Sequence, residues 1–359
     1  MGSVEISKER VLLVLHQPLS PEIESGIREK LADSELTIYE TELGVPVPPE
    51  IYRKATVLVT FAHLPEIQDS QNLKLIHTLS AGLDHLTHNP ILKEGRIPIS
   101  TSSGIHGPPI AEWTIMNWLV SSRNYDRQYE GQKARAWPDK TPYMVGNHDQ
   151  AGKKVGILGY GSIGRQIARV SQALGMSVYA YTASPRKTPE SKRDTGYIVP
   201  GTGDADGSIP VSWHHGTDKG SIRSFLAQGL DHLVISLPLT PQTTKVLGAK
   251  EFALLSASST SQTIKPFITN ISRGKVVDQD ALIEALESGQ LSGAALDVTD
   301  PEPLPADHPL WDAPNVQISP HVSGLGREYL PRSLDILKLN IQRLANGEPL
   351  INAYGGKGY

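Results

Sequence analysis

The sequence predicts an α/β fold made of two doubly wound parallel-sheet domains. Short apolar runs separated by helical pieces recur through the first hundred residues, and a second such series extends from Lys153 to about Pro320. Runs that are continuously apolar are typical of parallel strands covered by helices on both faces. The length of 359 residues suits two ordinary domains, each with its own core. We therefore expect two parallel sheets in helix–sheet–helix layers.

The order of the segments predicts where the two domains divide. Residues 110–123 have helical spacing and are interpreted as a core helix between the two series. A last amphipathic helix over 330–345 ends at Asn346-Gly347 and is expected to rejoin the first domain. We assign residues 1–109 with the return 325–359 to one domain and residues 110–324 to the other. The expected strands of the first domain are Val11–Leu15, Leu36–Tyr39, Ala55–Thr60 and Leu73–Leu79.

Composition excludes several classes of partner and chemistry. The formal charge of −4 is not gathered into blocks, which argues against a nucleic-acid partner or an anionic membrane surface. The chain has no cysteine, so disulfides, thiolate catalysis and cysteine-ligated zinc are excluded. The longest apolar runs are far shorter than the roughly 20 residues that span a bilayer. Charged residues among the first ten do not fit a secretory signal, so we expect a cytoplasmic protein.

A glycine-rich turn predicts a dinucleotide site. An apolar strand from Lys153 leads into Gly159-x-Gly161-x-x-Gly164, and helical periodicity follows over 165–174. The first glycine permits a tight turn, the second lets the backbone approach a pyrophosphate, and the third lets helix and strand pack closely. Amides of the first helical turn then hold the anion. Strand, turn and helix stand in the required order, so this segment predicts a Rossmann domain.

The acidic residue that commonly follows the second strand of such a domain is missing. It would bind the ribose 2′-hydroxyl of NAD, but no Asp or Glu occurs between Lys153 and Pro189. An uncharged tip followed by cations would instead suit a 2′-phosphate, although the cations have the alternative explanation of solvated loop charges. We predict NADP as the preferred cofactor and NAD as the alternative. The predicted contacts at this tip are Thr182, Ser184 and Arg186.

Three more segments place polar side chains just past the carboxyl ends of expected strands. Arg273, Glu302 and His321 each follow an apolar run. Open α/β sheets build their sites at this edge. Taken singly, each residue has an ordinary structural explanation, as a surface cation, a loop carboxylate or a satisfied histidine beside proline. Their order along one chain is the more specific signal.

Together these segments resemble the D-isomer-specific 2-hydroxyacid dehydrogenases over nearly the whole chain. The resemblance rests on the Ser-Arg-Gly arginine at 273, the Asp-Val-x-x-x-Glu-Pro-Leu-Pro run from 297, the Asp-His-Pro-Leu-Trp segment 307–311 and the Pro-His-Val-Ser-Gly histidine at 321. It implies an NAD(P)-dependent oxidoreductase that transfers hydride to a 2-oxo acid and gives a D-2-hydroxy acid. It also implies a flavodoxin-like substrate domain and a homodimer joined through the cofactor domains.

The resemblance assigns catalytic roles to three residues and a cofactor contact to a fourth. His321 would be the general acid that protonates the carbonyl oxygen, for which its ring must be charged near neutral pH. Glu302 would pair with His321 and favour the charged ring. Arg273 would hold substrate oxygens and stabilise the developing oxyanion. Asp297 would orient the nicotinamide through its carboxamide.

The same resemblance implies the binding residues. The loop 79–84 looks like the family's Ser-x-Gly-x-Asp loop, in which Ser80 and the amides of Ala81 and Gly82 would meet the substrate carboxylate. His106 is a weaker candidate for reaching the substrate. The remaining implied cofactor contacts are Arg165 and the amides near Ser162 and Ile163 at the pyrophosphate, with Leu237 and Pro238 beside the adenosine.

Two stretches depart from the family pattern. Residues 187–221 hold six glycines and are interpreted as a surface insertion. They include His214 and His215, but no third ligand is evident, so no metal site is predicted. The polar residues 256–265, between a helix ending near Leu255 and the next strand, are interpreted as a second insertion. Both are expected on the cofactor domain, away from the catalytic motifs.

Two rival functions remain open on the sequence. Formate dehydrogenase shares the fold but carries glutamine at the position of Glu302, so this residue argues against it. A dinucleotide-sensing corepressor or scaffold on the same fold would keep the site mainly for binding. Turnover of NADPH with a panel of 2-oxo acids separates this scaffold from an enzyme.

Overall fold

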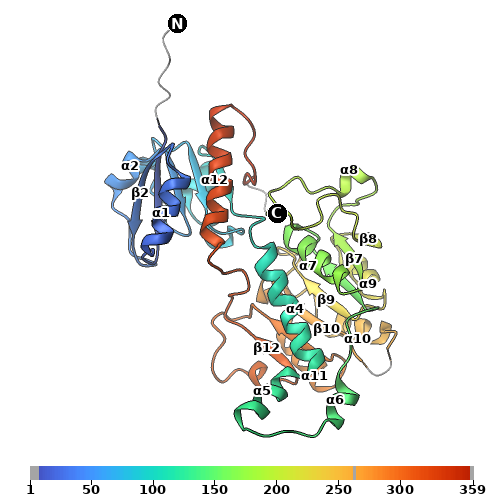
Figure 1. Cartoon of the computed structure of the whole chain (residues 1–359). Coiled ribbons are helices and arrows are strands. Elements are labelled where there is room, and N and C mark those ends of the chain that lie inside the picture. Colours follow the sequence, from blue (N-terminus) through green and yellow to red (C-terminus); the bar gives the residue numbers. More distant parts are fainter. Residues whose placement is uncertain (1–7, 262–263, 356–359) are drawn as a thin grey trace. The chain divides into compact units, whose positions relative to one another are not determined.

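Two parallel sheets organise the computed structural model, which describes residues 8–261 and 264–355 (Figure 1). The described chain divides into two compact units. The N-terminal unit holds the residues up to Ile105 together with those from Gly326 onward, and the central unit is His106–Leu325. The expectation of an α/β fold with two parallel-sheet domains is confirmed.

The N-terminal unit contains a five-stranded sheet in the order β2-β1-β3-β4-β5, with every pairing parallel. This is the flavodoxin-like order expected for this unit. The strands are β1 Arg10–Leu15, β2 Glu35–Glu40, β3 Val57–Thr60, β4 Leu75–Thr78 and β5 Ile99–Thr101. The helices are α1 Pro21–Lys30, α2 Pro49–Lys54, α3 Pro90–Glu94 and α12 Tyr329–Ala345.

The apolar run of β1 is continuous because both faces of its sheet are covered. Leu12 and Val14 join the core on one face, and Val11 and Leu13 join the core on the other face. The second core includes Leu334 of α12, and Figure 1 shows α1 and α12 side by side on the N-terminal unit. The last helix of the chain therefore packs into the core formed by the first hundred residues.

The central unit contains a seven-stranded sheet in the order β12-β11-β10-β9-β6-β7-β8, also parallel throughout. Its core follows the Rossmann order, with β6 as the first strand. The strands are β6 Lys154–Leu158, β7 Ser177–Thr182, β8 Ser212–His215, β9 His232–Ile235, β10 Phe267–Asn270, β11 Gly293–Leu296 and β12 Val316–Ile318. The helices are α4 Gly107–Arg123, α5 Tyr125–Lys133, α6 Thr141–Gly146, α7 Ser162–Ala173, α8 Pro189–Lys192, α9 Lys219–Leu226, α10 Ala249–Ser258 and α11 Gln279–Glu287.

Helices cover both faces of this sheet as well. Trp118 of α4 and Ile167 of α7 are fully buried in one core, and Phe225 of α9 and Phe252 of α10 are fully buried in the other. Trp118 also donates from Nε1 to Thr269 Oγ1 of β10, at 2.8 Å, so its single polar group is satisfied inside the core. No helix in the described part of the chain has the length and apolarity needed to cross a membrane.

The two expected insertions need correction. Within 187–221, β8 pairs with β7 as the edge strand of the sheet and α9 begins at Lys219, so the long irregular part is reduced to 193–211. Buried residues such as Asp204, 5% exposed, show that this part is not a simple surface loop. The second stretch begins inside α10, which continues to Ser258, and its residues 262 and 263 lie outside the described chain.

Candidate active site

The glycine-rich turn joins β6 to α7. Gly159 has a φ of +100°, and a Cβ on it would come within 2.3 Å of the carbonyl oxygen of Ser236. A Cβ on Gly164 would lie 2.5 Å from the carbonyl oxygen of Gly159, so glycine is needed for α7 to pack this closely. Beside Gly161 the described residues leave open space at the start of a twelve-residue helix. This cradle fits a pyrophosphate, because helix N-terminal amides and the helix dipole stabilise an anion there.

The loop after β7 carries the exposed cation Arg186 and lacks the Asp or Glu that commonly binds the ribose 2′-hydroxyl of NAD. Thr182 Oγ1 donates to the carbonyl oxygen of Ser184 at 2.8 Å. The exposed Arg186 donates from Nη1 to the carbonyl oxygen of Ser191 at 2.7 Å. Leu237 and Pro238 lie two and three residues past β9, the strand on the other side of β6. These predicted cofactor residues therefore lie at the carboxyl ends of the two strands that flank β6.

Arg165 does not fit the role predicted for it. Its side chain is buried, 3% exposed, and donates from Nη2 to the carbonyl oxygen of Lys192 at 2.7 Å and from Nη1 to that of Asp204. Its Nε lies 3.3 Å from a carboxylate oxygen of Asp194. A guanidinium committed to these internal partners offers no exposed donor to a pyrophosphate. The prediction of an anion site is therefore left with the backbone around Ser162 and Ile163.

The predicted catalytic residues follow three neighbouring strands. Arg273 comes after β10, Glu302 after β11 and His321 after β12, and these strands are adjacent in the sheet. Parallel strands end at the same edge, so the three residues come from the edge that also carries the glycine-rich turn.

His321 and Glu302 form a direct pair. His321 Nδ1 lies 2.6 Å from Glu302 Oε1, with both side chains partly exposed. A carboxylate only accepts, so Nδ1 carries the proton of this bond, and Nε2 is the nitrogen that can serve a substrate. The His321 backbone has a φ of +57°, which an L residue adopts rarely, and its amide donates to the carbonyl oxygen of Asp297 at 2.9 Å. Such a conformation persists only where the surroundings impose it.

Asp297 supplies much of that constraint. Its buried carboxylate accepts hydrogen bonds from the amides of Val322 and Ser323, at 2.8 and 3.0 Å, and from the hydroxyls of Ser319 and Ser323. These bonds fasten the loop of His321 to the end of β11. The structure thus shows a positioning task for Asp297, while its contact with a nicotinamide stays a prediction.

Gln279 is a functional candidate that sequence reasoning missed. It is the first residue of α11, and its side-chain amide exchanges two hydrogen bonds with the backbone of Asp300. Oε1 accepts from the Asp300 amide at 2.9 Å, and Nε2 donates to the Asp300 carbonyl. The bonded residue lies two positions before Glu302, so Gln279 positions the loop of that carboxylate. No local motif marks this contact, because the partners are 21 residues apart.

Arg273 is held by the turn that follows β10. Asn270 accepts from the Ser272 amide at 3.1 Å and donates to the carbonyl oxygen of Arg273 at 3.1 Å. Arg273 Nη1 donates to the carbonyl oxygen of Ser272 at 2.8 Å. Its side chain remains partly exposed. The Asn-Ile-Ser-Arg segment therefore builds a self-bonded turn that presents the arginine at the sheet edge.

His106 does not suit acid catalysis near neutral pH. It precedes α4, is 8% exposed, and lies close to Gly324, whose added Cβ would meet the ring at 3.2 Å. Burial lowers the pKa of His106 to about 4, so its ring is neutral at pH 7.

In the N-terminal unit the predicted substrate loop follows β4. The amide of Leu79 donates to the carbonyl oxygen of Thr60 at 2.9 Å, and Tyr329 of α12 donates its hydroxyl to the carbonyl oxygen of Leu79 at 2.6 Å. These bonds fix the start of the loop, while Ala81 and Gly82 stay partly exposed. The loop is therefore anchored but accessible.

Four aromatic rings gather beside this loop at the carboxyl edge of the same sheet. His16 follows β1, and its ring centroid is 4.9 Å from that of His63 and 6.1 Å from that of Phe61, which both follow β3. His85, in the 3₁₀ turn after the substrate loop, stacks on Phe61 at 5.1 Å. Both ring nitrogens of His16, Nδ1 of His63 and the hydroxyl of Ser80 are buried without a hydrogen-bond partner among the described residues. Burial, followed by the neighbouring His63, lowers the pKa of His16.

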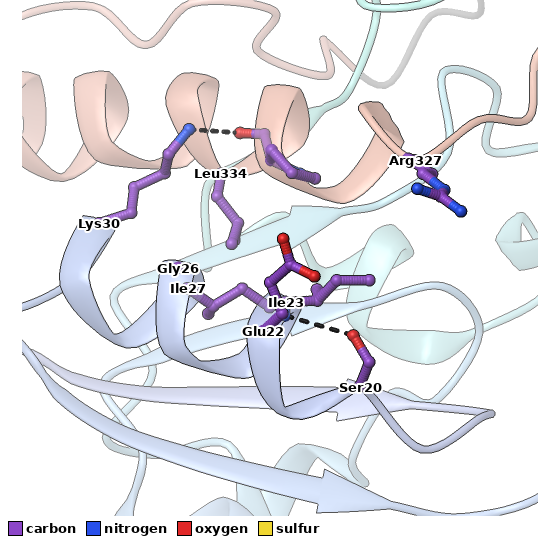
Figure 2. Close-up of a pocket in the computed structure, with 9 residues that line it drawn as sticks. Ser20, Glu22, Ile23, Gly26, Ile27, Lys30, Arg327 and Leu334 are labelled. Carbon is purple, nitrogen blue, oxygen red and sulfur yellow. Dashed lines mark hydrogen bonds between the residues drawn. The ribbon is translucent and has the colours of Figure 1, made fainter.

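A separate hollow of about 500 Å³ lies between α1 and α12 (Figure 2). Its floor is apolar, with Ile27 and Leu334, and Lys30 at its edge already donates to the carbonyl oxygen of Pro331 at 2.8 Å. None of the predicted site residues lines it. Across the described residues, no three His, Asp or Glu side chains converge as a metal site.

Comparison with known proteins identifies the class of protein that this fold and site define. The chain belongs to the D-isomer-specific 2-hydroxyacid dehydrogenases, because the model of that family's NAD-binding domain matches residues 115–200 and 212–323. The predicted resemblance is thereby confirmed, and with it a dehydrogenase that uses NAD or NADP.

Individual relatives and solved structures that are similar to this chain carry more specific names. The human protein named glyoxylate reductase/hydroxypyruvate reductase is 31% identical over 280 residues, covering 78% of this chain and 76% of its own. The mouse protein of that name is 32% identical over 251 residues, covering 70% and 67%. Among solved structures, the NADPH-dependent glyoxylate/hydroxypyruvate reductase of Sinorhizobium meliloti, in complex with NADP and sulfate, superposes with a TM-score of 0.74 at 25% identity over 98% of this chain and 99% of its own.

Proposed function

We propose that this enzyme reduces small 2-oxo acids, with glyoxylate and hydroxypyruvate as the model substrates, and that it prefers NADPH. The observation that carries the proposal is the 2.6 Å pair of His321 and Glu302 on the sheet edge that holds the glycine-rich turn. Relatives named for these two substrates agree with it. The substrate loop at Ser80–Gly82 is proposed to bind the carboxylate, which assigns the N-terminal unit to the substrate.

Four residues of the chain have separate roles in the proposed reaction. The bound nicotinamide supplies the hydride that reaches the carbonyl carbon. His321 donates the proton of Nε2 to the carbonyl oxygen, while Glu302 holds the charged ring through Nδ1. Arg273 binds substrate oxygens and stabilises charge on the former carbonyl oxygen. Asp297 fixes the loop of His321 and is proposed also to orient the carboxamide of the nicotinamide.

The ring cluster supports a polar substrate side chain. An aliphatic side chain placed on His16 and His63 would leave their buried nitrogens unpaired, which costs about 1–3 kcal/mol for each such group. A hydroxyl would pair with one of them. Burial lowers the pKa of His16, which favours its neutral ring, and a neutral imidazole both donates and accepts. The cluster therefore favours hydroxypyruvate over branched 2-oxo acids.

The preference for NADPH is supported by the exposed Arg186 beside the end of β7 and by the lack of an acid from Lys153 to Pro189. Two solved relatives at 25% identity hold NADP, from Rhizobium etli and Sinorhizobium meliloti. Ser162 and Ile163 are proposed to bind the pyrophosphate, and Leu237 and Pro238 to border the adenosine.

We propose that two copies associate through the central unit. Large apolar side chains are exposed on the described segment from α4 to α6, with Met116 at 52%, Trp137 at 91%, Met144 at 83% and Val145 at 84%. Exposed apolar surface of this kind is typical of an association face. The cytoplasmic location stays a prediction.

Steady-state turnover of NADPH with glyoxylate, hydroxypyruvate, pyruvate and branched or aromatic 2-oxo acids tests the proposal. We expect the highest kcat/KM with the two model substrates. Tight binding of NADPH without turnover of any substrate would instead favour a dinucleotide-sensing scaffold.

A further inference from the structure

The irregular segment 193–211, called the strap here, joins α8 to β8 in the central unit. The family model matches residues up to 200 and resumes at 212, so much of the strap is additional to the family's domain. An additional segment would ordinarily be expected to pack loosely on the surface. The strap is instead hydrogen-bonded to the elements of the predicted cofactor site at several points, which indicates a functional role.

The first fastening is to α7, the helix that begins at the glycine-rich turn. Gln166 Oε1 accepts from the amide of Gly203 at 2.6 Å, and Arg169 donates to the carbonyl oxygen of Gly203 at 3.3 Å. One turn earlier, the buried Arg165 donates to the carbonyl oxygen of Asp204. Three polar residues of α7, at positions 165, 166 and 169, therefore hold the middle of the strap.

The second fastening is to the glycine-rich turn itself. Tyr160, between Gly159 and Gly161, donates its hydroxyl to Asp204 Oδ2 at 2.8 Å. The two side chains are 4% and 5% exposed. Asp204 also accepts from the amides of Ser208 and Ile209, at 3.0 and 3.2 Å, which fixes its rotamer. Burial and the bond to Asp204 raise the pKa of Tyr160, so its hydroxyl remains a donor.

The third fastening reaches the loop of Arg186. Arg165 donates to the carbonyl oxygen of Lys192, the last residue of α8 before the strap, at 2.7 Å. The preceding residue, Ser191, accepts from Arg186 through its carbonyl oxygen at 2.7 Å. Arg165 therefore connects the helix at the pyrophosphate end to the loop at the 2′-phosphate end.

We propose that the strap is a brace for the dinucleotide site, in which Asp204 and Arg165 are positioning residues for the glycine-rich turn and for Arg186. The inference rests on the proposed binding of NADPH at these two places. Asp204 acts on the turn through Tyr160 and thus on the pyrophosphate, which NADPH and NADH share. Arg165 acts also on Arg186 and thus on the 2′-phosphate, which only NADPH carries.

The test compares Tyr160→Phe, Asp204→Asn and Arg165→Met with the full-length wild-type enzyme, and measures Kd for NADPH and NADH, kcat at saturating cofactor, and Tm. Tyr160→Phe removes one hydroxyl and keeps the ring packed against Trp213. Gln150→Ala is the matched control, because it removes a buried bond, of 2.9 Å to His232, at the amino end of β6 in the same unit.

We expect Tyr160→Phe and Asp204→Asn to raise Kd for both cofactors about threefold to tenfold, the worth of one buried hydrogen bond, with kcat within about twofold of wild type. The double variant should lose less than the sum of the single variants. Arg165→Met should raise Kd for NADPH more than Kd for NADH. Gln150→Ala should lower Tm and leave both Kd values unchanged.

Wild-type Kd values in Tyr160→Phe and Asp204→Asn, together with a Tm lowered as in the control, would overturn the brace and leave the strap a purely structural addition. Equal losses for both cofactors in Arg165→Met would remove its link to Arg186. A wild-type enzyme that binds neither cofactor would overturn the proposed function instead, so the two failures are distinguishable.

Discussion

His321 is held at its backbone by Asp297 and at its ring by Glu302, which leaves one nitrogen for proton transfer. We expect His321→Ala to lower kcat for reduction by about two to four orders of magnitude, the usual contribution of a positioned acid or base. Kd for NADPH should stay near its wild-type value, since the ring is not proposed to bind the cofactor. Stopped-flow and steady-state rates measure the change, and a near-normal kcat would reject His321 as the acid.

Glu302 contributes charge rather than a proton. In Glu302→Gln the hydrogen bond to Nδ1 can persist, but the charged ring loses its anionic partner. We expect kcat/KM for reduction to fall about tenfold, because a hydrogen bond to a charged group contributes about 1.5–3 kcal/mol and one between neutral groups about 0.5–1.5 kcal/mol. Steady-state kinetics with hydroxypyruvate measure the change, and an unchanged kcat/KM would show that the 2.6 Å contact has no electrostatic role.

His16 offers a test of substrate choice with an internal control. His16→Leu removes the buried polar ring that faces His63, so kcat/KM for hydroxypyruvate should fall about tenfold relative to a branched 2-oxo acid, the worth of one polar pairing. Glyoxylate has no side chain, and its kcat/KM should change little. A uniform loss for all three substrates would mean that His16 supports the fold and not specificity.

At the residue scale, the sequence alone predicted where a side chain lies when that place follows from the order of the strands along the chain. Arg273, Glu302 and His321 follow adjacent parallel strands, so their common edge could be predicted once the strands were recognised. Gln279 and Asp204 could not be found in this way. Each acts through a hydrogen bond to a residue 21 or 44 positions away, and no spacing rule marks such a partner. Arg165 was misassigned for the same reason.

At the element scale, the buried strands were predictable because both of their faces are apolar. β8 was missed because it is an edge strand, with the sequence Ser-Trp-His-His and partly exposed side chains that carry no apolar pattern. The glycines around it favoured a loop. Pairing with β7 decided the outcome, since tertiary context can override local preference in a strand.

The loop between β7 and α8 carries the prediction on cofactor choice. Arg186→Ala should raise KM for NADPH about tenfold or more, because a charge-assisted hydrogen bond to phosphate contributes about 1.5–3 kcal/mol. KM for NADH should remain within about twofold. Arg127→Ala, at an exposed arginine of α5, is the matched control for a lost surface charge. Equal losses for the two cofactors would show that this loop does not bind the 2′-phosphate.

At the scale of the whole molecule, a buried histidine ties the end of the chain to its beginning. His77 of β4 is fully buried, with Nδ1 2.8 Å from Ser100 Oγ of β5 and Nε2 3.1 Å from Ser333 Oγ of α12. Burial lowers its pKa to about 4, against an ordinary value of 6.5. His106 and His232 are also buried with lowered pKa values, in the central unit. Both units therefore contain rings that must stay neutral in the folded state.

This burial predicts loss of stability in acid. The unfolded chain binds more protons than the folded chain between pH 6.5 and about pH 4, so the contribution of His77 is complete above pH 6.5 and is lost as the pH falls toward 4. The loss for this residue is on the order of 3 kcal/mol. Urea unfolding followed by circular dichroism at pH 7 and pH 5 should show about 2 kcal/mol of this loss, since pH 5 lies above the folded-state pKa. His77→Gln does not titrate and should lose less stability between the two pH values, whereas His88→Gln, at an exposed histidine, should lose as much as wild type. Parallel losses in wild type and His77→Gln would mean that protonation of His77 does not drive acid unfolding.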